Sequence, residues 1–519
     1  MSTLAPAFSS DADMAAFREM LARADYSIAG VCKAVNVPDF DTLRRTAPPL
    51  LSARTSAGRP IDILIKLFIL GETLHAAHVD EGLAPLSAKV LADAGLLVLQ
   101  EFPGQGVAAA AKVTMMPYED LVLAYSARLQ HGPAANDFVM GPGMTSRILA
   151  CQMLTHRRTR TLDLGTGCGV LALMAAKHSD HVVGTDLSPH AIAFAQFNAK
   201  LNGITNVEFH QGSLFEPVAG ESFDHILCNP PFVITPKAGY MYRDSGMAGD
   251  AMTETVIRMA PQHLAEGGFA QIIGNWATLT NKPVRDRVVE WLRGNNCDTL
   301  ILNNKVQNVL EYATSWIEES EPVPSDQRWR VLQEWLKSFH DLEIVGITYG
   351  TATLRKRSSS AAPGTPGGNW ISTDDIPEVV DRAVGEHLAR IFAGRHVLAG
   401  MGAEVEKRLV DVVLKPSPDL RVETILGPRT SDNAITGSDE GSWTQVSTAL
   451  KLAHGFPIRQ EIDANQAAFV LSLDGYRSVM SILSGMAGDR AGSISLSAAR
   501  LGGWLIEKGL VEVVGGANV

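Results

Sequence analysis

The stretch TLDLGTGCGVLAL (161–173) decides the fold, because it places a glycine-rich turn between two apolar runs. The run that ends at Leu164 predicts a β-strand, and the residues from Val170 onward predict a helix. The turn holds three glycines, Gly165, Gly167 and Gly169. Val170 stands where the dinucleotide fingerprint GxGxxG needs a glycine, so the loop favours a nucleoside without a pyrophosphate.

The surrounding sequence alternates between predicted strands and helices from about residue 162 to residue 353. The strand-like runs TLDL, HVVGTD, NVEFHQ and FDHILC are separated by helical segments such as PHAIAFAQFNAKLNG. GFAQIIGNW predicts a further strand, and IVGITYGTATLRK a late one that can lie antiparallel. Such alternation predicts an α/β fold with a mainly parallel sheet.

Two carboxylates flank the glycine-rich turn in the predicted sheet. Asp186 ends the second strand, where it can accept hydrogen bonds from two ribose hydroxyls. Asp163 precedes the first glycine by two residues and can meet an ammonium group. A GxGxG loop alone is equally a tight strand-to-helix turn, so the hypothesis depends on both carboxylates and on the alternating pattern.

The sequence NPPF, residues Asn229 to Phe232, follows the strand-like run FDHILC directly. The Asn229 side chain and the Pro230 carbonyl can each accept a hydrogen bond from a planar NH2 group. Pro230 and Pro231 fix the backbone between these acceptors, and Phe232 offers an aromatic face for stacking. The alternative is an Asn-Pro turn at the end of an edge strand, but ligands gather at the carboxyl ends of parallel strands.

With these motifs the chain resembles the class I S-adenosylmethionine-dependent methyltransferases. LDLGTGCG is similar to their first motif, Asp186 to their acidic residue after the second strand, and NPPF to their amino-methylating motif. The resemblance covers about residues 138–355. It implies a Rossmann-like core of seven strands, the last antiparallel, and S-adenosylmethionine as the cofactor.

The resemblance also implies a set of site residues. Asp163 and Gly165 would lie near the methionine part of the cofactor, Asp186 at the ribose and Ser213 near the adenine, where an Asp is usual. The implied cofactor-binding residues are Asp163, Leu164, Gly165, Thr166, Gly167, Gly169, Asp186, Leu187, Gly212, Ser213, Leu214 and Asn229. The implied catalytic residues are Asn229, Pro230, Pro231 and Phe232, and no metal is expected.

The NH2 acceptor stays open at this point. Relatives with NPPF or NPPY act on the glutamine amide of release factors (the HemK type), on adenine N6, or on guanine N2 in ribosomal RNA. FVMGPGMTSRILA (138–150) lies where the HemK type has a PRPET-like segment, and only Thr145 agrees with it. Thr145 is a candidate substrate residue, and so are Tyr240, Tyr242 and Arg243 if the segment 237–254 forms a loop over the substrate. The alternative is that this segment is a surface loop that ends in a helix cap at Asp250.

The core is expected to be flanked by two mainly helical domains. We divide the chain into residues 1–135, a helical and winged-helix-like domain, 136–356, the methyltransferase domain, 357–372, a Ser/Pro/Gly-rich linker, and 373–519. In the first domain two predicted helices (61–74, 85–97) precede a hairpin, and Pro48-Pro49 is expected to end an earlier helical section. WLIEKGLVEVV (504–514) resembles VLADAGLLVLQ (90–100), which suggests a second winged-helix-like unit. Such units bind nucleic acid, or they only pack and form a homodimer.

Composition sets the remaining limits. The chain has 519 residues, 46% of them hydrophobic and 19% charged, which is typical of a multidomain globular protein. Its net charge of −11 argues against strong sequence-independent binding to nucleic acid. We expect no membrane span, no secretory signal and a cytoplasmic protein with reduced cysteines.

The leading hypothesis is therefore an enzyme that methylates a planar nitrogen by direct in-line transfer. One alternative keeps this chemistry but acts on a small metabolite. The other is a non-catalytic protein that binds nucleic acid and only senses the cofactor.

Overall fold

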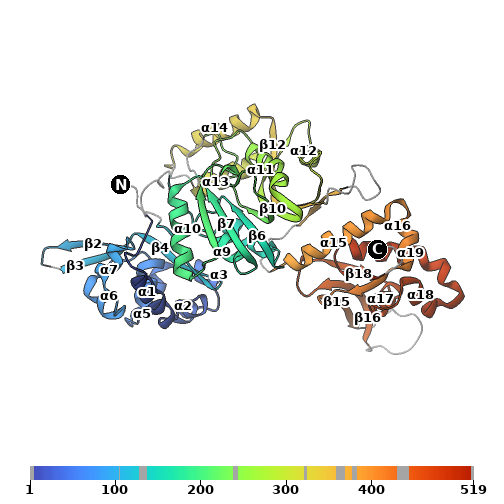
Figure 1. The fold of residues 1–519 in the computed structure, drawn as a ribbon, viewed down its shortest axis with the longest axis horizontal. Helices are drawn as coiled ribbons and strands as arrows, with labels where there is room; N and C mark the ends of the chain where they lie inside the picture. The colour runs from blue at the N-terminus through green and yellow to red at the C-terminus, as the bar shows by residue number, and fades with distance from the viewer. Residues whose placement is uncertain are drawn as a thin grey trace.

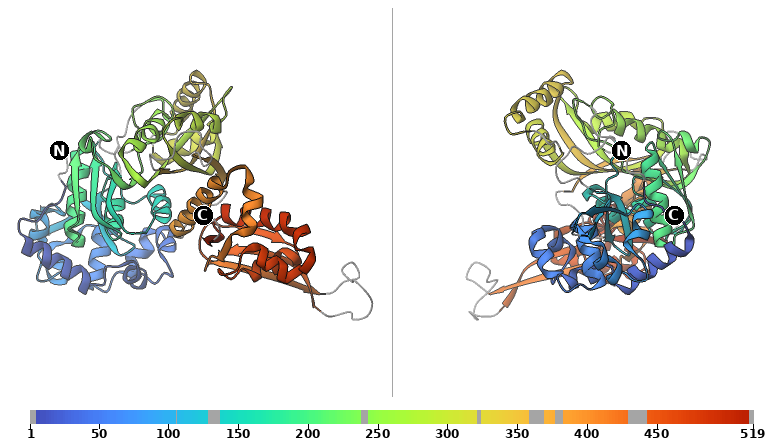
Figure 2. Two further views of the ribbon diagram at one scale, coloured as in Figure 1. Left: turned by 45° about the vertical axis from the view of Figure 1, so that its right-hand side comes forward. Right: turned by 90° about the vertical axis from the view of Figure 1, so that its left-hand side faces the viewer.

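The computed structural model describes residues 5–104, 106–127, 137–237, 243–320, 324–357, 369–376, 383–428 and 443–515. An N-terminal unit and a C-terminal unit lie at opposite ends of a central α/β unit (Figures 1 and 2). None of the helices in these residues has the length and apolar character that crossing a lipid bilayer would require.

One eight-stranded sheet carries the central unit, with strand order β13-β11-β12-β10-β9-β6-β7-β8. Strands β6 to β10 pair in parallel, whereas β12 runs antiparallel to both of its neighbours. This arrangement confirms the predicted α/β fold and the antiparallel late strand. The strands are β6 (Arg158–Leu164), β7 (Ser179–Asp186), β8 (Val207–Gln211), β9 (Phe223–Cys228), β10 (Leu264–Leu279), β11 (Cys297–Asn308), β12 (Ile344–Lys356) and β13 (Ile371–Asp375).

The eighth strand, β13, differs from the predicted count of seven and shortens the predicted linker. It pairs in parallel with β11, from Ile371 opposite Thr299 to Asp375 opposite Asn303. Residues 371 and 372, placed in the linker by their Ser/Pro/Gly-rich surroundings, therefore belong to the sheet. The segment ISTDD has a single apolar residue, so its pairing at the sheet edge depends on backbone hydrogen bonds rather than on a readable apolar pattern.

Helices cover both faces of the sheet, each over its own apolar core. On one face α9 (Val170–Ala175) and α10 (Pro189–Asn202) contribute Leu171 and Phe194. On the other face α11 (Ala251–Met259) and α12 (Val284–Trp291) contribute Val256 and Val288. The remaining α-helices of this unit are α8 (Met144–Gln152), before the sheet, and α13 (Val309–Ser320) and α14 (Arg328–Asp341), inserted between β11 and β12. Two short 3-10 helices, η2 (Glu216–Val218) and η3 (Ala260–His263), complete the described helical elements.

The ends of α10 follow from its sequence. The Ser188 hydroxyl accepts the Ala191 amide hydrogen, and Pro189 occupies the first turn, where no backbone donor is needed. Gly203 ends the helix with a φ of 67°, a conformation that glycine adopts at no steric cost. The predicted segment 189–203 is therefore confirmed as a helix.

The N-terminal unit contains the predicted helix, helix and hairpin, with further short elements. Pro48-Pro49 begins the helix α4 instead of ending a section, because proline at the first helical positions loses no hydrogen bond. The designation winged helix stays a prediction. The elements are α1 (Asp11–Arg23), α2 (Ile28–Ala34), α3 (Phe40–Arg45), α4 (Pro48–Arg54), α5 (Pro60–Leu64), the π-helix η1 (Ile65–Ile69), β1 (Leu74–His75), α6 (Ala76–Gly82), α7 (Ala88–Asp93), β2 (Leu97–Phe102), β3 (Gly106–Ala111), β4 (Val113–Tyr118) and β5 (Leu121–Ser126).

Strand β5 attaches this unit to helix α10 of the central unit. The side-chain amide of Asn198 donates to the Ala124 carbonyl and accepts the Ala124 amide hydrogen, both at 2.8 Å. Asn202 makes the same pair of bonds with Val122. Two asparagines one helical turn apart thus take the place of a neighbouring strand and satisfy the edge of β5.

The C-terminal unit is less helical than predicted. Two sheets, β14-β18 and β15-β16-β17, pack with its helices around a separate core that includes Leu414, Leu450 and Ile506. The middle of this region, which has no clear apolar pattern in the sequence, forms β15 and β16. Each strand is exposed over part of its length, so its sequence shows little alternation of apolar and polar residues. The elements are α15 (Gly385–Met401), α16 (Val405–Arg408), β14 (Val413–Pro416), β15 (Leu420–Pro428), β16 (Trp443–Leu452), β17 (Arg459–Ile462), α17 (Ala464–Ser472), α18 (Val479–Ala487), α19 (Ala491–Glu507) and β18 (Val511–Gly515), with short 3-10 turns η4 (Gly402–Glu404), η5 (Leu409–Asp411) and η7 (Gly488–Arg490).

The two similar segments, 90–100 and 504–514, fold alike. Each runs from a helix, α7 or α19, through a glycine into a strand, β2 or β18. Gly95 and Gly509 both have positive φ, 77° and 64°. A shared need for a glycine between helix and strand explains the sequence similarity.

Candidate active site

A cavity of about 250 Å³ lies at the sheet edge where the parallel strands β6, β7, β8 and β9 end. The carboxyl edge of a parallel sheet is where ligands of α/β proteins bind. Most of the predicted site residues meet at this cavity. Those that line it are Leu164, Gly165, Thr166, Gly167, Asp186, Leu187, Gly212, Ser213, Leu214, Asn229, Pro230 and Pro231.

The glycine-rich loop leaves open space for a ligand. Gly165, Gly167 and Gly169 all have positive φ, between 55° and 87°. A Cβ built on Gly167 would have no atom within 4 Å, and one on Gly165 would approach only the Asn229 carbonyl oxygen, at 3.9 Å. Gly169, by contrast, packs against Ala195 of α10 and does not line the cavity. The first two glycines therefore fit close approach by a ligand, and the third serves packing.

Asp163 lies beneath the loop and not in the cavity wall. Its side chain is fully buried, and its Oδ2 accepts the Thr166 hydroxyl at 2.7 Å and the Ala172 amide hydrogen at 2.9 Å. Its Oδ1 has no hydrogen-bond partner among the described residues. Burial raises the pKa of Asp163 to about 6, against the lowering effect of these two donors. The orphaned oxygen fits an ammonium group, which is a strong donor.

Asp186 closes the loop from the neighbouring strand. Its Oδ2 accepts the Gly167 amide hydrogen and its Oδ1 the Ser188 amide hydrogen, both at 2.9 Å. Burial raises the pKa of this carboxyl group, and the two backbone donors oppose that shift. Each carboxylate oxygen keeps a second lone pair, so Asp186 can hold the loop and still accept a ribose hydroxyl.

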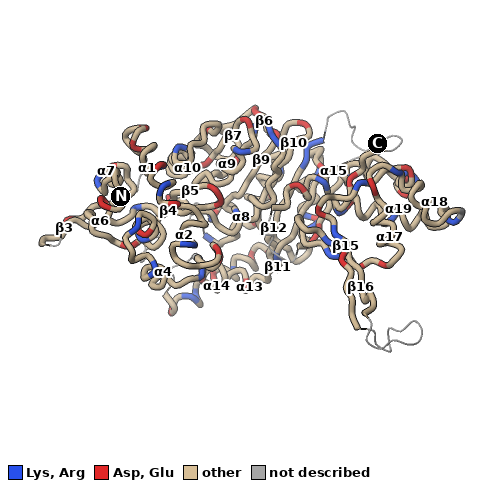
Figure 3. The backbone as a smooth tube through the Cα atoms, turned by 90° about the horizontal axis from the view of Figure 1, so that it is seen from below, with Lys and Arg blue, Asp and Glu red and all other residues tan. Residues whose placement is uncertain are grey.

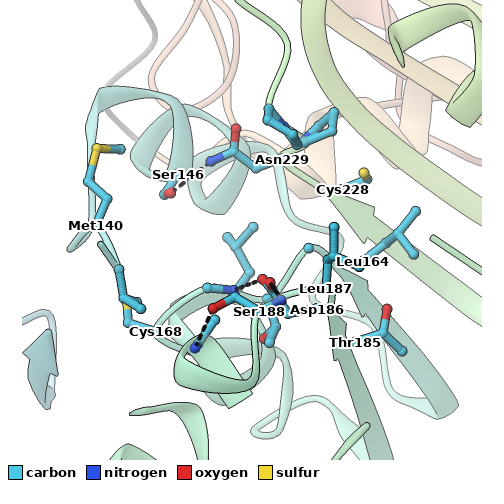
Figure 4. A pocket seen from close by; sticks show the side chains of 18 of the residues that line it. Met140, Ser146, Leu164, Cys168, Thr185, Asp186, Leu187, Ser188, Cys228 and Asn229 are labelled. Carbon is cyan, nitrogen blue, oxygen red and sulfur yellow. Dashed lines mark hydrogen bonds between the residues drawn. The ribbon is translucent and has the colours of Figure 1, made fainter. Parts of the chain in front are cut away.

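The Asn229 amide is oriented by the first turn of α8 (Figure 4). Its Nδ2 donates to the Thr145 hydroxyl at 3.1 Å and to the Ser146 hydroxyl at 3.0 Å. No described donor reaches its Oδ1, so this oxygen remains an acceptor. Figure 4 shows Asn229 and Ser146 on the opposite side of the cavity from Asp186 and Ser188. The nucleoside side and the NPPF side thus face one another.

The residues of NPPF divide between the cavity and the core. Pro230 and Pro231 line the cavity. Phe232 does not line it: the side chain is only 8% exposed, and its ring packs against Tyr349 of β12 with the centroids 6.0 Å apart. The described cavity therefore gives Phe232 no face for stacking, and its role as a stacking platform stays a prediction.

A buried tyrosine holds the chain just after NPPF. The Tyr312 hydroxyl, on α13, accepts the Ile234 amide hydrogen at 3.0 Å and the Asn275 side-chain amide at 2.7 Å. Tyr312 is 2% exposed, and its ring contacts Trp335 and Phe339. The inserted helices α13 and α14 are thus connected to the NPPF loop through one phenol oxygen.

The predicted substrate residues have different positions. Thr145 contacts Asn229 as described, while Tyr240 and Tyr242 lie outside the described residues. Arg243 is 4% exposed and donates from its Nη2 to the Asp244 carboxylate at 3.0 Å. Asp244 lines the cavity and Arg243 does not, so Arg243 neutralises a carboxylate in the cavity wall.

Sequence reasoning missed several lining residues. Ser146 and Asp244 each adjoin a residue that was singled out, Thr145 and Arg243, and that adjacency was the available signal. Cys168 and Cys228 also line the cavity, but burial raises the pKa of Cys168 to about 12 and that of Cys228 well above its usual value. Both therefore stay thiols and supply no thiolate nucleophile.

The mainly parallel sheet, the glycine-rich loop, Asp186 and the NPPF loop together define a Rossmann-like methyltransferase. Comparison with known proteins agrees. Residues 142–290 match the family model described as "Methyltransferase small domain", and residues 23–110 match a domain of unknown function, DUF7059.

The names of several related proteins state which group those proteins methylate. A putative protein N5-glutamine methyltransferase of Methanocaldococcus jannaschii is 32% identical over 143 residues, which cover 26% of this chain and 71% of that protein. The release factor glutamine methyltransferase of Aliivibrio fischeri is 44% identical over 88 residues, which cover 16% of this chain and 31% of that protein. That of Escherichia coli is 31% identical over 142 residues, covering 24% and 50%.

Solved structures align less closely. The YcgJ protein of Bacillus subtilis, for example, is 17% identical with a TM-score of 0.28 over 42% of this chain and 98% of that one. The fold assignment therefore rests on the strand order of this chain's own sheet.

The chain belongs to the methyltransferase small domain family of class I S-adenosylmethionine-dependent methyltransferases. The match spans 31% of the Aliivibrio fischeri release factor enzyme and 50% of the Escherichia coli one. S-adenosylmethionine is the methyl donor of the family, and the open loop at Gly165 and Gly167 together with the orphaned Asp163 oxygen fits that cofactor.

Proposed function

We propose that this chain methylates the side-chain amide nitrogen of a glutamine residue in a protein. The observation that carries the proposal is the orientation of the Asn229 amide, whose nitrogen is bonded to Thr145 and Ser146. The amide oxygen is then left as an acceptor beside the Pro230 carbonyl, and both residues line the cavity. One acceptor per N–H fits a planar NH2 group and fits a hydroxyl or thiol less well.

Binding of the cofactor is assigned to the loops after β6, β7 and β8. Gly165 and Gly167 would allow close approach of the methionine part, and the Asp163 oxygen without a partner would accept its ammonium group. Asp186 would bind the ribose hydroxyls, with Leu187 and the segment from Gly212 to Leu214 around the adenine. Leu187 is 56% exposed, which supports an apolar contact that a flat base would cover.

The chemistry of the acceptor step follows from the poor nucleophilicity of an amide nitrogen. When bound, the cofactor supplies a methyl group on a positively charged sulfur. Asn229 Oδ1 and the Pro230 carbonyl would orient the NH2 group toward that methyl group and stabilise the positive charge that grows on nitrogen. No described side chain is required as a strong base before attack, because the N–H groups become acidic only as the bond to carbon forms.

The names of the relatives favour glutamine over a nucleobase or a metabolite. The archaeal relative and the release factor enzymes are named for glutamine, and a uL3 methyltransferase of Bradyrhizobium diazoefficiens is likewise named for a glutamine of a ribosomal protein. The net charge of −11 agrees with a protein acceptor better than with a nucleic acid. Acidic and basic residues are also interspersed along the N-terminal unit (Figure 3).

Transfer of tritium from labelled S-adenosylmethionine to cell extract fractions tests this proposal. We expect label in the protein fraction, and none when the extract is treated with protease first. Label confined to RNA, DNA or small molecules would contradict the protein acceptor. An Asn229→Ala variant that labels protein at the wild-type rate would contradict the assigned mechanism.

A further inference from the structure

A second cavity of about 330 Å³ lies between the N-terminal unit and the central unit. Its walls come from α3 and the β4–β5 hairpin on one side and from the segment before α8 on the other. Cavities between domains are preferred places for ligands. Its lining includes Asp39, Asp41, Glu119, Tyr118, Tyr125 and Arg147.

The segment from Gly141 to Arg147 contributes residues to the walls of both this cavity and the active site. Gly141 and Ser146 line the active-site cavity, whereas Pro142, Gly143 and Arg147 line the second one. Tyr125 lies directly against this segment, since a Cβ built on Gly141 would be 2.4 Å from its ring carbon Cζ. A ligand in the second cavity therefore lies behind the same turn whose hydroxyls orient Asn229.

The walls combine aromatic surface with carboxylates. Tyr118, Tyr125 and Phe40 provide the aromatic part. The Asp41 carboxylate pairs with Arg147 at 3.1 Å. Glu119 and Asp39 form no ion pair with any residue of the described chain, and Asp39 accepts the Thr42 amide hydrogen. Arg44 also lines the cavity and forms no ion pair in the described chain, so three carboxylates there outnumber two guanidinium groups.

This combination selects a positively charged side chain on a peptide. Carboxylates attract a lysine or arginine, and an aromatic wall holds such a cation by cation–π attraction. A third cavity, beyond the NPPF loop, lacks this selectivity because its charges are already paired. There Lys237 pairs with Glu334 at 2.9 Å and Lys337 with Asp341 at 2.6 Å.

We propose that the second cavity binds the extended segment of the acceptor protein next to the methylated glutamine, through a lysine or arginine of that segment. The inference rests on the proposed function, because only a macromolecular acceptor has a flanking segment. The glutamine side chain of the acceptor would reach Asn229. The acceptor backbone beside that glutamine would cross the Gly141–Arg147 segment into the second cavity, which we call the groove. The N-terminal unit thereby contributes substrate specificity without touching the reacting atoms.

Charge changes at Glu119 test the proposal. Glu119 is exposed in the turn between β4 and β5, so Glu119→Lys and Glu119→Gln leave the core packing intact. The assay measures tritium transfer to total cell protein as a function of extract concentration, together with the affinity for S-adenosylmethionine by calorimetry. Glu101→Lys, on an exposed position of β2 outside the groove, is the matched control.

We expect Glu119→Lys to raise the half-saturating extract concentration about fivefold or more, and Glu119→Gln to raise it less. The maximal rate, the cofactor affinity and the Glu101→Lys control should stay at wild-type values. Added salt should weaken wild-type saturation more than that of Glu119→Gln.

An equal half-saturating extract concentration for wild type and Glu119→Lys would overturn the assignment of the groove, while the proposed function would stand. A loss of maximal rate without a change in saturation would also overturn it. Absence of label from protein with the wild-type enzyme would overturn the proposed function, and the groove assignment with it.

Discussion

The glycine-rich loop after β6 and the NPPF loop after β9 are neighbours on one sheet edge, yet they are held in different ways. Leu164 and Cys228, the last residues of their strands, lie opposite each other in the parallel pairing. The glycine-rich loop is held from β6 and β7 themselves, by Asp163 and Asp186. The NPPF loop is held by side chains from two distant segments, α8 and α13, and Asn275 of β10 bonds the α13 phenol in turn.

Under the proposed function, the glycine-rich loop binds a cofactor common to the family, and the NPPF loop binds an acceptor specific to this enzyme. A cofactor that is the same for the whole family needs a loop whose shape depends only on nearby residues. An acceptor that differs between enzymes needs a loop that inserted and flanking segments can adjust. Under the proposed function, Tyr312, on the helices inserted between β11 and β12, and the first turn of α8 would provide that adjustment for the NPPF loop.

The largest expected effect is at the acceptor side. Asn229→Ala removes one of two proposed acceptors and leaves the hydroxyls of Thr145 and Ser146 without their donor. We expect kcat to fall about 10²–10³-fold, by analogy with removal of one transition-state hydrogen bond, while the Kd for S-adenosylmethionine changes little. Single-turnover kinetics and calorimetry measure the two quantities separately. If kcat and the affinity for S-adenosylmethionine fell by the same factor, the two loops would not have separate roles.

The second effect is at the cofactor side. Asp186→Ala removes the acceptor of the Gly167 and Ser188 amide hydrogens and the proposed ribose contact. Hydrogen bonds to a charged group contribute about 1.5–3 kcal/mol each, so we expect the Kd for S-adenosylmethionine to rise about 100-fold. The maximal rate at saturating cofactor should stay within about threefold of wild type. Unchanged cofactor affinity would contradict the role of Asp186.

A smaller effect tests the long-range support of the NPPF loop. Tyr312→Phe leaves two buried donors, the Ile234 amide and the Asn275 side chain, without their acceptor. We expect kcat to fall about tenfold, equivalent to about 1.4 kcal/mol, with the cofactor Kd unchanged.

Tyr349→Phe is the matched control for Tyr312→Phe. Its hydroxyl is buried with no partner among the described residues, and its ring contact with Phe232 survives the change. Because the control removes no hydrogen bond, its stability and rate should equal or exceed those of the wild type. Equal rates for the two variants would show that Tyr312 only packs.

The smallest effect is a pH dependence of cofactor affinity. Burial holds the pKa of Asp163 at about 6 without ligand, and a bound ammonium group would lower it. Binding then releases a proton below pH 6, so affinity should weaken as the pH falls from about 6 to 5, by a few-fold. Calorimetry across this range, repeated with Asp163→Asn, should show the dependence in the wild type only. A level profile in the wild type would place the ammonium group elsewhere.

The sequence was most informative where the contacts are local. Gly165, Gly167, Asp186 and Asn229 could be placed at one sheet edge, because strand alternation brings the ends of parallel strands together. Phe232 and Arg243 were expected in the site but are buried beside it, since their partners Tyr349 and Asp244 depend on packing that no local pattern encodes. The strand β13 and the sheet β15-β16-β17 of the C-terminal unit escaped prediction because their apolar alternation is weak.

The contacts that define the acceptor side were also beyond sequence reasoning. Ser146 and Tyr312 lie about 80 residues from the NPPF positions they contact, on either side in the chain. Such separations leave no spacing rule to read, in contrast to the strand-and-turn rule that identifies the glycine-rich loop.

The most direct test of the central claim is the chemical form of the label in the methylated protein. Acid hydrolysis of a protein that carries a methyl group on a glutamine amide nitrogen releases the label as volatile methylamine. We predict that most of the tritium transferred by the wild-type enzyme leaves as methylamine. Label retained on lysine or arginine, or released as methanol from an ester, would contradict a site in which Asn229 and Pro230 orient a planar amide.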